Sequence, residues 1–210
     1  MQIQTFPLPP LDTNAYLLTA SSRDDAVLVD APPGALAAIA PALAKNGRRL
    51  TALLLTHGHW DHMADAAACR AAGAAVYAHA ADRDWIEHPM QQADFMLPGL
   101  DIAPAKIDHF LTPGQVLEVA GLRFEVRHVP GHAPGNVLFY CAEDKAALVG
   151  DAIFAGAVGR PDLPGGDWPQ LEKSIRTQIY TLPGDTVIHP GHGPTTTVAR
   201  ERATNMFVRG

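Results

Sequence analysis

Residues 57–62 constrain the fold of this chain most, because they place three histidines and one aspartate directly after the apolar run 50–55. If that run is a buried strand, His57 and His59 are two residues apart and project to the same side of the extended chain. Both can then reach one ion. Asp61 and His62 lie where the chain turns into the Ala-rich segment 63–72, so they can serve a second ion beside the first. The fold must therefore bring a strand end to a metal site.

Three further apolar runs each lead into a residue type that binds metals. The runs cover 122–129, 146–150 and 186–188, and the residues that follow them are His132, Asp151 and His192. Because strand ends at one edge of a sheet are where open α/β folds build their sites, distance along the sequence does not keep these groups apart. The predicted ligand set comprises seven residues: His57, His59, Asp61, His62, His132, Asp151 and His192.

Hydrophobic periodicity and turn residues predict an alternation of strands and helices along the whole chain. Strands are expected near Ile3 and over 15–19, 26–30, 51–55, 75–78, 116–119, 122–129, 137–141, 146–150 and 187–188. Helices are expected over 36–45, 63–72, 80–86, 168–181 and 198–207. Two strand-rich halves that each carry helices predict two sheets sandwiched between helices, and 210 residues suit one domain. The irregular segments 88–108 and 156–167 are expected to line or cover the site.

Charge and composition narrow the classes of function. The formal net charge is −6 and no run of Lys or Arg occurs, which argues against nucleic acid or an anionic membrane as the partner. No apolar run approaches the ~20 residues of a membrane span, and residues 1–10 lack a basic start. Cys69 and Cys141 are expected as small buried residues and not as a disulfide. We expect a cytoplasmic protein, and the sequence leaves its oligomeric state open.

These motifs resemble the metallo-β-lactamase superfamily, whose fold is an αββα sandwich. The segments 159–162 and 190–194 look most like the short glyoxalase II-like, or hydroxyacylglutathione hydrolase-like, enzymes. The resemblance implies one metal held by His57, His59 and His132, a second held by Asp61, His62 and His192, and a bridge formed by Asp151. It also places Asp30 where the superfamily has an aspartate behind a metal ligand. A plain turn or helix-start role for Asp30 is the alternative.

The sequence also departs from full-length glyoxalase II enzymes. Those enzymes carry an extra helical C-terminal domain that contributes glutathione contacts, whereas eighteen residues follow His192 here. We therefore expect one metallo-β-lactamase-like domain over 1–210 without that addition. Arg160 stands where glyoxalase II has a lysine that contacts the glutathione carboxylate, which makes it a candidate substrate anchor. An ion pair of Arg160 with Asp162 or Asp167 is the alternative.

The ligand types indicate the chemistry. Imidazole and carboxylate groups suit two divalent ions, most plausibly zinc, with iron or manganese as other choices. A zinc-bound water has a pKa near ~7 and supplies a nucleophile at neutral pH. The expected enzyme is a dinuclear hydrolase of a small anionic thioester such as S-D-lactoylglutathione, in which Asp61 and Asp151 also take part in catalysis.

Two other functions stay open at this stage. Persulfide dioxygenases of the same superfamily bind one iron through residues that match His57, His132 and Asp151, although the ending 190–194 favours the hydrolase. A non-enzymatic metal-binding protein is the remaining possibility. Seven ligands exceed what a closed tetrahedral structural site needs, which argues against it.

Overall fold

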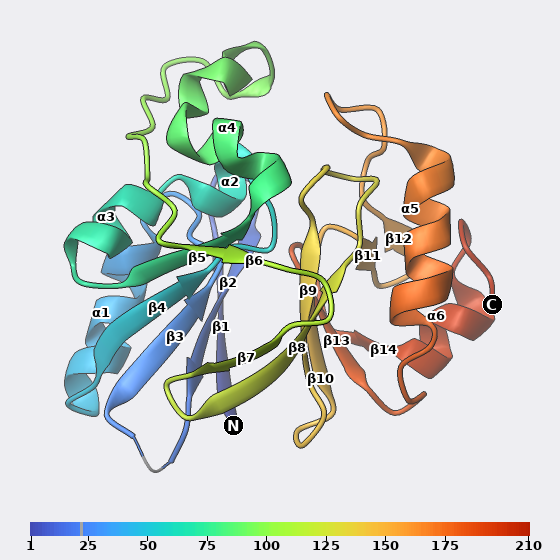
Figure 1. The fold of residues 1–210 in the computed structure, drawn as a ribbon, viewed down its shortest axis with the longest axis horizontal. Coiled ribbons are helices and arrows are strands. Elements are labelled where there is room, and N and C mark those ends of the chain that lie inside the picture. The colour runs from blue at the N-terminus through green and yellow to red at the C-terminus, as the bar shows by residue number, and fades with distance from the viewer. Residues whose placement is uncertain (22) are drawn as a thin grey trace.

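Two mixed six-stranded sheets packed face to face form the centre of the computed structural model, which describes residues 1–21 and 23–210 (Figure 1). The first sheet runs in the order β1 (Gln2–Leu8), β2 (Thr13–Thr19), β3 (Asp25–Val29), β4 (Arg49–Leu54), β5 (Ala75–His79) and β6 (His109–Leu111). The second runs in the order β14 (Thr196–Thr197), β13 (Val187–Pro190), β10 (Ala146–Gly150), β9 (Val137–Cys141), β8 (Leu122–His128) and β7 (Val116–Val119). The strands β3 to β6 are parallel, as are β10 and β13.

Side chains that alternate between the two faces of each strand divide the core into layers. In β3, Ala26 and Leu28 face one hydrophobic cluster, whereas Val27 and Val29 face another. The second of these clusters fills the space between the sheets, where Phe124 and Phe139 of the second sheet meet the first. Successive side chains of a strand point to opposite faces, so a strand buried on both faces reads as a continuous apolar run.

Helices cover both outer faces of the sandwich. The helices α1 (Ala35–Lys45) and α3 (Ala66–Ala71) pack on the first sheet. On the second sheet lie α5 (Trp168–Ser174), which continues as a π-helical stretch η3 (Ile175–Ile179), and α6 (Val198–Thr204). The predicted αββα arrangement of one domain is thus confirmed.

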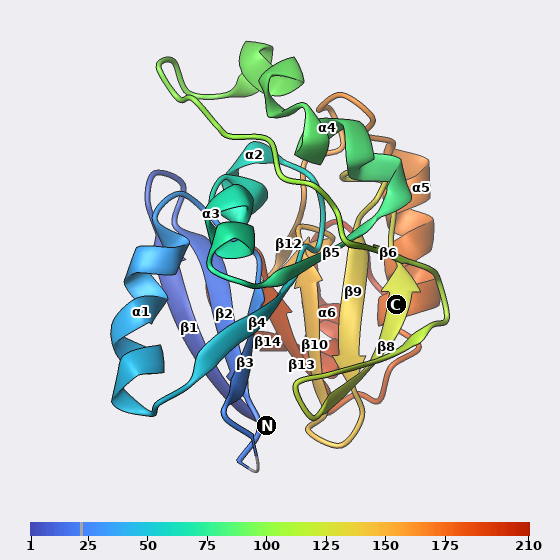
Figure 2. The same ribbon diagram turned by 60° about the vertical axis from the view of Figure 1, so that its left-hand side comes forward.

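Short elements lie at the end of the sandwich where the ligand-bearing strands stop (Figure 2). These are α2 (Trp60–Met63), the 3₁₀ turn η1 (Ala80–Asp82), α4 (Arg83–Glu87) and the 3₁₀ stretch η2 (Pro89–Phe95). A small hairpin of β11 (Ile153–Phe154) and β12 (Ala157–Val158) follows the end of β10. The predicted irregular segments therefore hold some regular structure, in η2 and in β12.

Two predicted helices differ from the structure for tertiary reasons. The helix expected over 63–72 is divided into α2 and α3, because Asp65 at the break bonds to another segment: its N–H donates to the carbonyl of Ala31, and its carboxylate accepts from the N–H of Leu36. The last helix ends at Thr204 and not at 207, since the Asn205 side chain donates to the carbonyl of Ala157.

Two expectations from composition can be compared with the fold. Cys69 and Cys141 are both buried and unbonded to each other, as expected. Within residues 1–21 and 23–210, no helix is both long enough and apolar enough to cross a membrane.

Candidate metal centre

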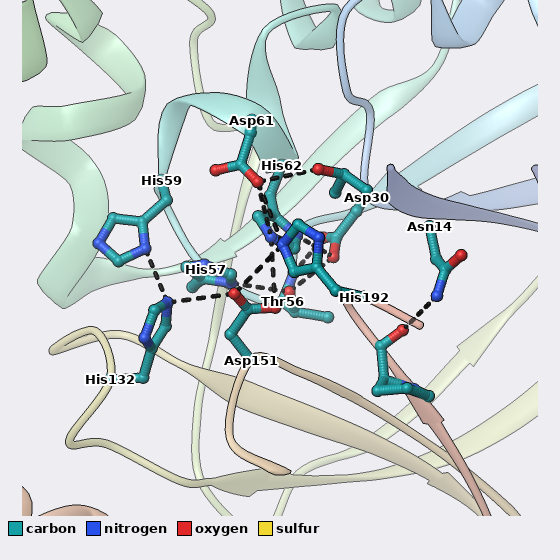
Figure 3. Close-up of polar contacts among 12 residues, drawn as sticks. Asn14, Asp30, Thr56, His57, His59, Asp61, His62, His132, Asp151 and His192 are labelled. Atoms are coloured by element: carbon teal, nitrogen blue, oxygen red, sulfur yellow. Dashed lines mark hydrogen bonds and ion pairs between the residues drawn. The ribbon is translucent and has the colours of Figure 1, made fainter. Parts of the chain in front are cut away.

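All seven predicted ligands meet between the ends of the two sheets (Figure 3). Four of them come from the first sheet: His57 and His59 follow β4, and Asp61 and His62 lie in α2. The other three follow β8, β10 and β13 of the second sheet, and they are His132, Asp151 and His192. Both sheets therefore contribute to the site, each from its carboxyl-end loops.

The ligand atoms form overlapping groups, each within 4.8 Å. One group is His57, His59 and His132, a second is Asp61, His62 and His192, and a third joins His57 and His62 to Asp151. The Asp151 carboxylate lies between the first two groups. Its Oδ1 is 3.4 Å from Nε2 of His62, and its Oδ2 is 3.5 Å from Nε2 of His132 and 3.4 Å from Nε2 of His192.

Main-chain carbonyls fix the ring state of two histidines. Nδ1 of His132 lies 2.9 Å from the carbonyl oxygen of Arg160, and Nδ1 of His192 lies 3.1 Å from that of Leu11. A carbonyl only accepts hydrogen bonds, so Nδ1 carries the proton in both rings. Once a ring is neutral, it presents the bare lone pair of Nε2 to the centre, as metal-binding histidines do.

Asp30 fixes the rings of the first sheet in the same way. Its Oδ2 accepts hydrogen bonds from His62 Nδ1 at 2.8 Å and from the Thr56 hydroxyl at 2.7 Å. Because the Thr56 proton goes to Asp30, the hydroxyl oxygen accepts from Nδ1 of His57 at 3.0 Å. Asp30 also has a positive φ of 59° at the end of β3. Asp30 therefore hydrogen-bonds a candidate ligand and also takes a turn conformation.

The donor set fits divalent metal ions on its own geometry. Nε2 of His57, Nε2 of His62 and Oδ1 of Asp151 are buried and have no hydrogen-bond partner among the described residues. Nδ1 of His59 lies only 2.8 Å from Nε2 of His132, so two ring nitrogens point at each other. Buried polar atoms without partners are costly, and a shared cation satisfies them.

Electrostatics divide the site into two parts. Burial, aided by neighbouring histidines, holds the pKa of His57 well below its ordinary value, and burial lowers the pKa of His59 to about 3. Burial alone would also lower the pKa of His192, but Asp151 and Asp61 raise it to about 10. For His62, the same competition between burial and Asp61 raises the pKa well above its ordinary value. Metal binding at the His62 and His192 side must therefore release protons.

Sequence reasoning missed two residues that hold the His57–His62 loop in place. Asp82, which is buried, accepts hydrogen bonds from the N–H of Gly58 at 2.8 Å and of Gly135 at 2.7 Å. Gln92, also buried, accepts from the N–H of Trp60 and donates to the carbonyl of Gly58, both at 2.9 Å. Neither residue stands in a recognisable motif, so the local sequence gave no signal for them.

The start of β2 supports the site from the other side. The Thr13 hydroxyl donates to Oδ2 of Asp61 at 2.9 Å. The Asn14 amide donates to the carbonyls of Pro190 and Gly193, and the Tyr16 hydroxyl also donates to Pro190. These bonds tie β2 of the first sheet to the end of β13 and the loop that carries His192.

One glycine is required by close approach. A Cβ on Gly191 would lie 2.0 Å from Oδ1 of Asp151 and 2.6 Å from Cε1 of His62. No side chain fits there, because atoms cannot approach a Cβ so closely. The glycine of the Pro190-Gly191-His192 turn thus has a packing reason as well as a turn function.

A cavity of about 340 Å³ opens beside the centre, with His59, Asp61, His132, Asp151 and His192 on its polar side. Arg160 also lines it, but its guanidinium forms a two-bond ion pair with Asp162, at 3.0 and 2.8 Å. The ion pair offered as the alternative from sequence therefore exists. Trp60 lines the cavity and is also packed in the core.

The sequence matches the Metallo-beta-lactamase superfamily over residues 8–192, and the chain belongs to this superfamily. It is 34% identical to hydroxyacylglutathione hydrolase GloC of Haemophilus influenzae, over 99% of this chain and 98% of that protein. It is 32% identical to the probable metallo-hydrolase YqgX of Bacillus subtilis, over 100% of this chain and 99% of that protein.

Solved structures agree with this assignment. BLEG-1, described as a B3 metallo-beta-lactamase, superposes with a TM-score of 0.91 at 37% identity over the full length of both chains. TTHA1623, solved in a di-iron-bound form, gives 0.81 at 36% identity over 98% of this chain and all of its own. ETHE1 from Myxococcus xanthus superposes with a TM-score of 0.79 at 25% identity, over 98% of this chain and 84% of that chain. The superfamily and the His/Asp cluster together indicate a metal-dependent hydrolase that uses divalent metals.

Proposed function

We propose that this protein is a dinuclear metal-dependent thioesterase of hydroxyacylglutathione hydrolase type, acting on small anionic thioesters such as S-D-lactoylglutathione. The observation that carries the proposal is the carboxylate of Asp151, which lies between the two groups of donors and beside an open cavity: its Oδ2 is near both His132 and His192, and its Oδ1 is near His62. The likeness to GloC supports the substrate class. We propose zinc as the metal, with iron as the first substitute because TTHA1623 was solved with two irons.

Two divalent ions in this set would supply an activated water at neutral pH and polarise the substrate carbonyl. The protein holds the donor groups ready for that chemistry. His132 and His192 are fixed by carbonyls, His57 and His62 by Thr56 and Asp30, and Asp61 by Thr13. The preset donors need little rearrangement when the substrate binds. Since a thiol leaves as a thiolate with a pKa near ~8.5, no separate acid residue is required.

We further propose that Arg160 binds the carboxylate of an anionic thioester. Arg160 lines the cavity, and a guanidinium fork can hold a carboxylate through two bonds. The substrate must compete with Asp162 for this fork. Both partners are largely exposed, so the existing ion pair is weak and can be exchanged.

The direct test measures metal content and thioester cleavage on zinc-loaded protein. We expect up to two ions per chain and cleavage of S-D-lactoylglutathione with a high KM. Saturation at one ion per chain with full activity would contradict the dinuclear proposal.

A persulfide dioxygenase is the second candidate, since His57, His132 and Asp151 lie within the same cluster and could hold a single iron. Oxygen uptake with glutathione persulfide, confined to iron-loaded protein and without thioester cleavage by either metal form, would favour it over the hydrolase. An oxygen electrode run beside the thioester assay separates the two.

A further inference from the structure

Apolar residues from five segments line the cavity beside the metal centre, and we call them its apolar wall. They are Leu11 in the β1–β2 turn, Trp60 in α2, Phe95 and Leu97 at and just after the end of η2, Phe154 and Val158 in the β11–β12 hairpin, and Leu163 in the segment that follows β12. The side chains of Leu11 and Leu97 are 47% and 42% exposed. Large apolar side chains gathered around a polar site usually contact a ligand.

The wall is held at a fixed distance from the ligands. The ring of Phe95 meets that of His59 edge-on at 6.1 Å between centroids, and Phe154 meets His192 at 5.9 Å. Gln92 anchors η2 through its two bonds to the main chain of Gly58 and Trp60. The apolar surface is therefore built in place with the metal-binding loop and does not depend on a ligand to form it.

The charges around the cavity do not suit a highly charged acyl group. Among the described residues that line it, Arg160 is the single Lys or Arg, and its guanidinium already pairs with Asp162. Asp61 and Asp151 lie on the polar side with the other candidate metal ligands, where the scissile carbonyl would sit. A group that extends from that carbonyl across the cavity meets Leu11, Phe95 or Leu97.

We propose that this wall is an acyl subsite that prefers aliphatic or aromatic acyl groups larger than lactoyl. The proposal rests on the thioesterase function proposed above. A volume of about 340 Å³ lies at the small end of ligand sites, so the subsite takes an acyl group of a few carbons and not a long fatty chain. The hydroxyl of lactate would gain nothing from an apolar wall, whereas each added methylene is removed from water.

The test compares acetyl, butanoyl and hexanoyl thioesters of one neutral thiol, N-acetylcysteamine, on zinc-loaded protein. We expect kcat/KM to rise about threefold for each buried methylene, and Leu97→Ala to lower the hexanoyl-to-acetyl ratio about fivefold. Met90→Ala is the matched control, because Met90 is equally exposed in the same segment but does not line the cavity. Equal kcat/KM for the three thioesters overturns the subsite. An equal change of the hexanoyl-to-acetyl ratio in Leu97→Ala and Met90→Ala overturns it as well.

A second measurement separates this inference from the proposed function. If no thioester is cleaved, the thioesterase proposal fails, and binding of non-cleavable ketone analogues, in which a CH₂ replaces the thioester sulfur, tests the subsite alone. Calorimetry should show the analogue with a hexanoyl group binding at least tenfold tighter than the one with a lactoyl group, with the difference reduced in Leu97→Ala. Equal affinities of the hexanoyl and lactoyl analogues contradict the subsite. An analogue that carries its alkyl chain on the thiol side and binds as tightly as the hexanoyl analogue contradicts it as well.

Discussion

The two halves of the metal centre are built in different ways. The half from the first sheet comes from one loop, residues 57–62, and buried side chains from elsewhere hold it: Asp30, Asp82 and Gln92. The half from the second sheet comes from three loops, and main-chain atoms hold two of its histidines, through the carbonyls of Leu11 and Arg160. The first half therefore depends on distant side chains. The second depends chiefly on the path of the backbone, although Asp82 also bonds Gly135 in the loop that carries His132.

This difference predicts different sensitivities to mutation. A supporting side chain can be removed by one substitution, so the first half should lose metal affinity when Asp82 changes. A supporting carbonyl is present whatever the side chain, so the second half should tolerate a change of the side chain at 160. Asp151 belongs to the second half by sequence but faces donors of both halves. Its loss should therefore weaken metal binding in both halves.

The largest expected effect is that of Asp151→Ala. The variant removes the carboxylate between the two donor groups, so we expect it to lose the metal pair and at least ~10³-fold in kcat/KM, or about 4 kcal/mol of transition-state stabilisation. Elemental analysis beside a thioester assay measures both. Asp185→Ala, an exposed carboxylate paired with Lys145, is the control and should change neither. Retention of two ions by Asp151→Ala would show that the halves are independent.

The next effect concerns pH and Asp82. Burial raises the pKa of Asp82 to about 6 from 3.8, although the N–H groups of Gly58 and Gly135 oppose the rise. The folded state thus favours the protonated acid. Protonated Asp82 therefore stabilises the fold fully at a pH below its ordinary pKa. This stabilisation is lost as pH rises through about 6, and the unfolding free energy falls by up to about 3 kcal/mol.

Asp82→Asn removes this titration. Between about pH 4 and about pH 7, the unfolding free energy of metal-free Asp82→Asn should therefore rise relative to wild type by up to about 3 kcal/mol. Urea unfolding at both pH values measures it. Parallel pH profiles for the two proteins would mean that Asp82 titrates normally in the fold.

Metal affinity should respond to the same variant in the opposite direction. An amide in place of the carboxylate turns an N–H donor toward Gly58 or Gly135, so Asp82 loses its bond either to the 57–62 loop or to the loop that carries His132. We expect zinc to bind ~10–100-fold more weakly, as when other supporting groups behind metal ligands are changed. Competition with a chelator gives the constant, with the exposed neighbour Asp84→Asn as control. Unchanged affinity would mean that Gln92 alone suffices to hold the loop.

The smallest effect is expected at Arg160. Arg160→Ala should lower kcat/KM about tenfold or less for an anionic thioester, and less for a neutral one, because the guanidinium must first leave Asp162. Asp162→Ala frees the guanidinium and should act in the opposite direction. Metal content should stay the same in both variants, since the bond to His132 comes from the main chain. Equal losses on both substrates would assign Arg160 to loop structure.

The sequence predicted the strand ends and the seven donors because their signals are local. Period-two alternation in 122–129 and the Pro-Gly-His turns mark where the chain stops and exposes a ligand. Asp82 and Gln92 could not be found in this way, since their function consists of buried bonds to the backbone of Gly58 and Trp60. Local sequence does not distinguish a buried aspartate from a surface one. The division of the 63–72 helix at Asp65 likewise depends on partners far away in sequence.

The bond from His132 to the carbonyl of Arg160 constrains how such an enzyme can change its substrate over time. The backbone at 160 orients a candidate ligand, and the same residue lines the cavity. A Cβ at Gly159 would lie 1.9 Å from the carbonyl oxygen of Asp151, so the chain between Asp151 and Arg160 has little freedom. Point substitutions at 160 are thus an accessible evolutionary route to new specificity, whereas insertions or deletions between 151 and 160 would disturb metal binding at the same time.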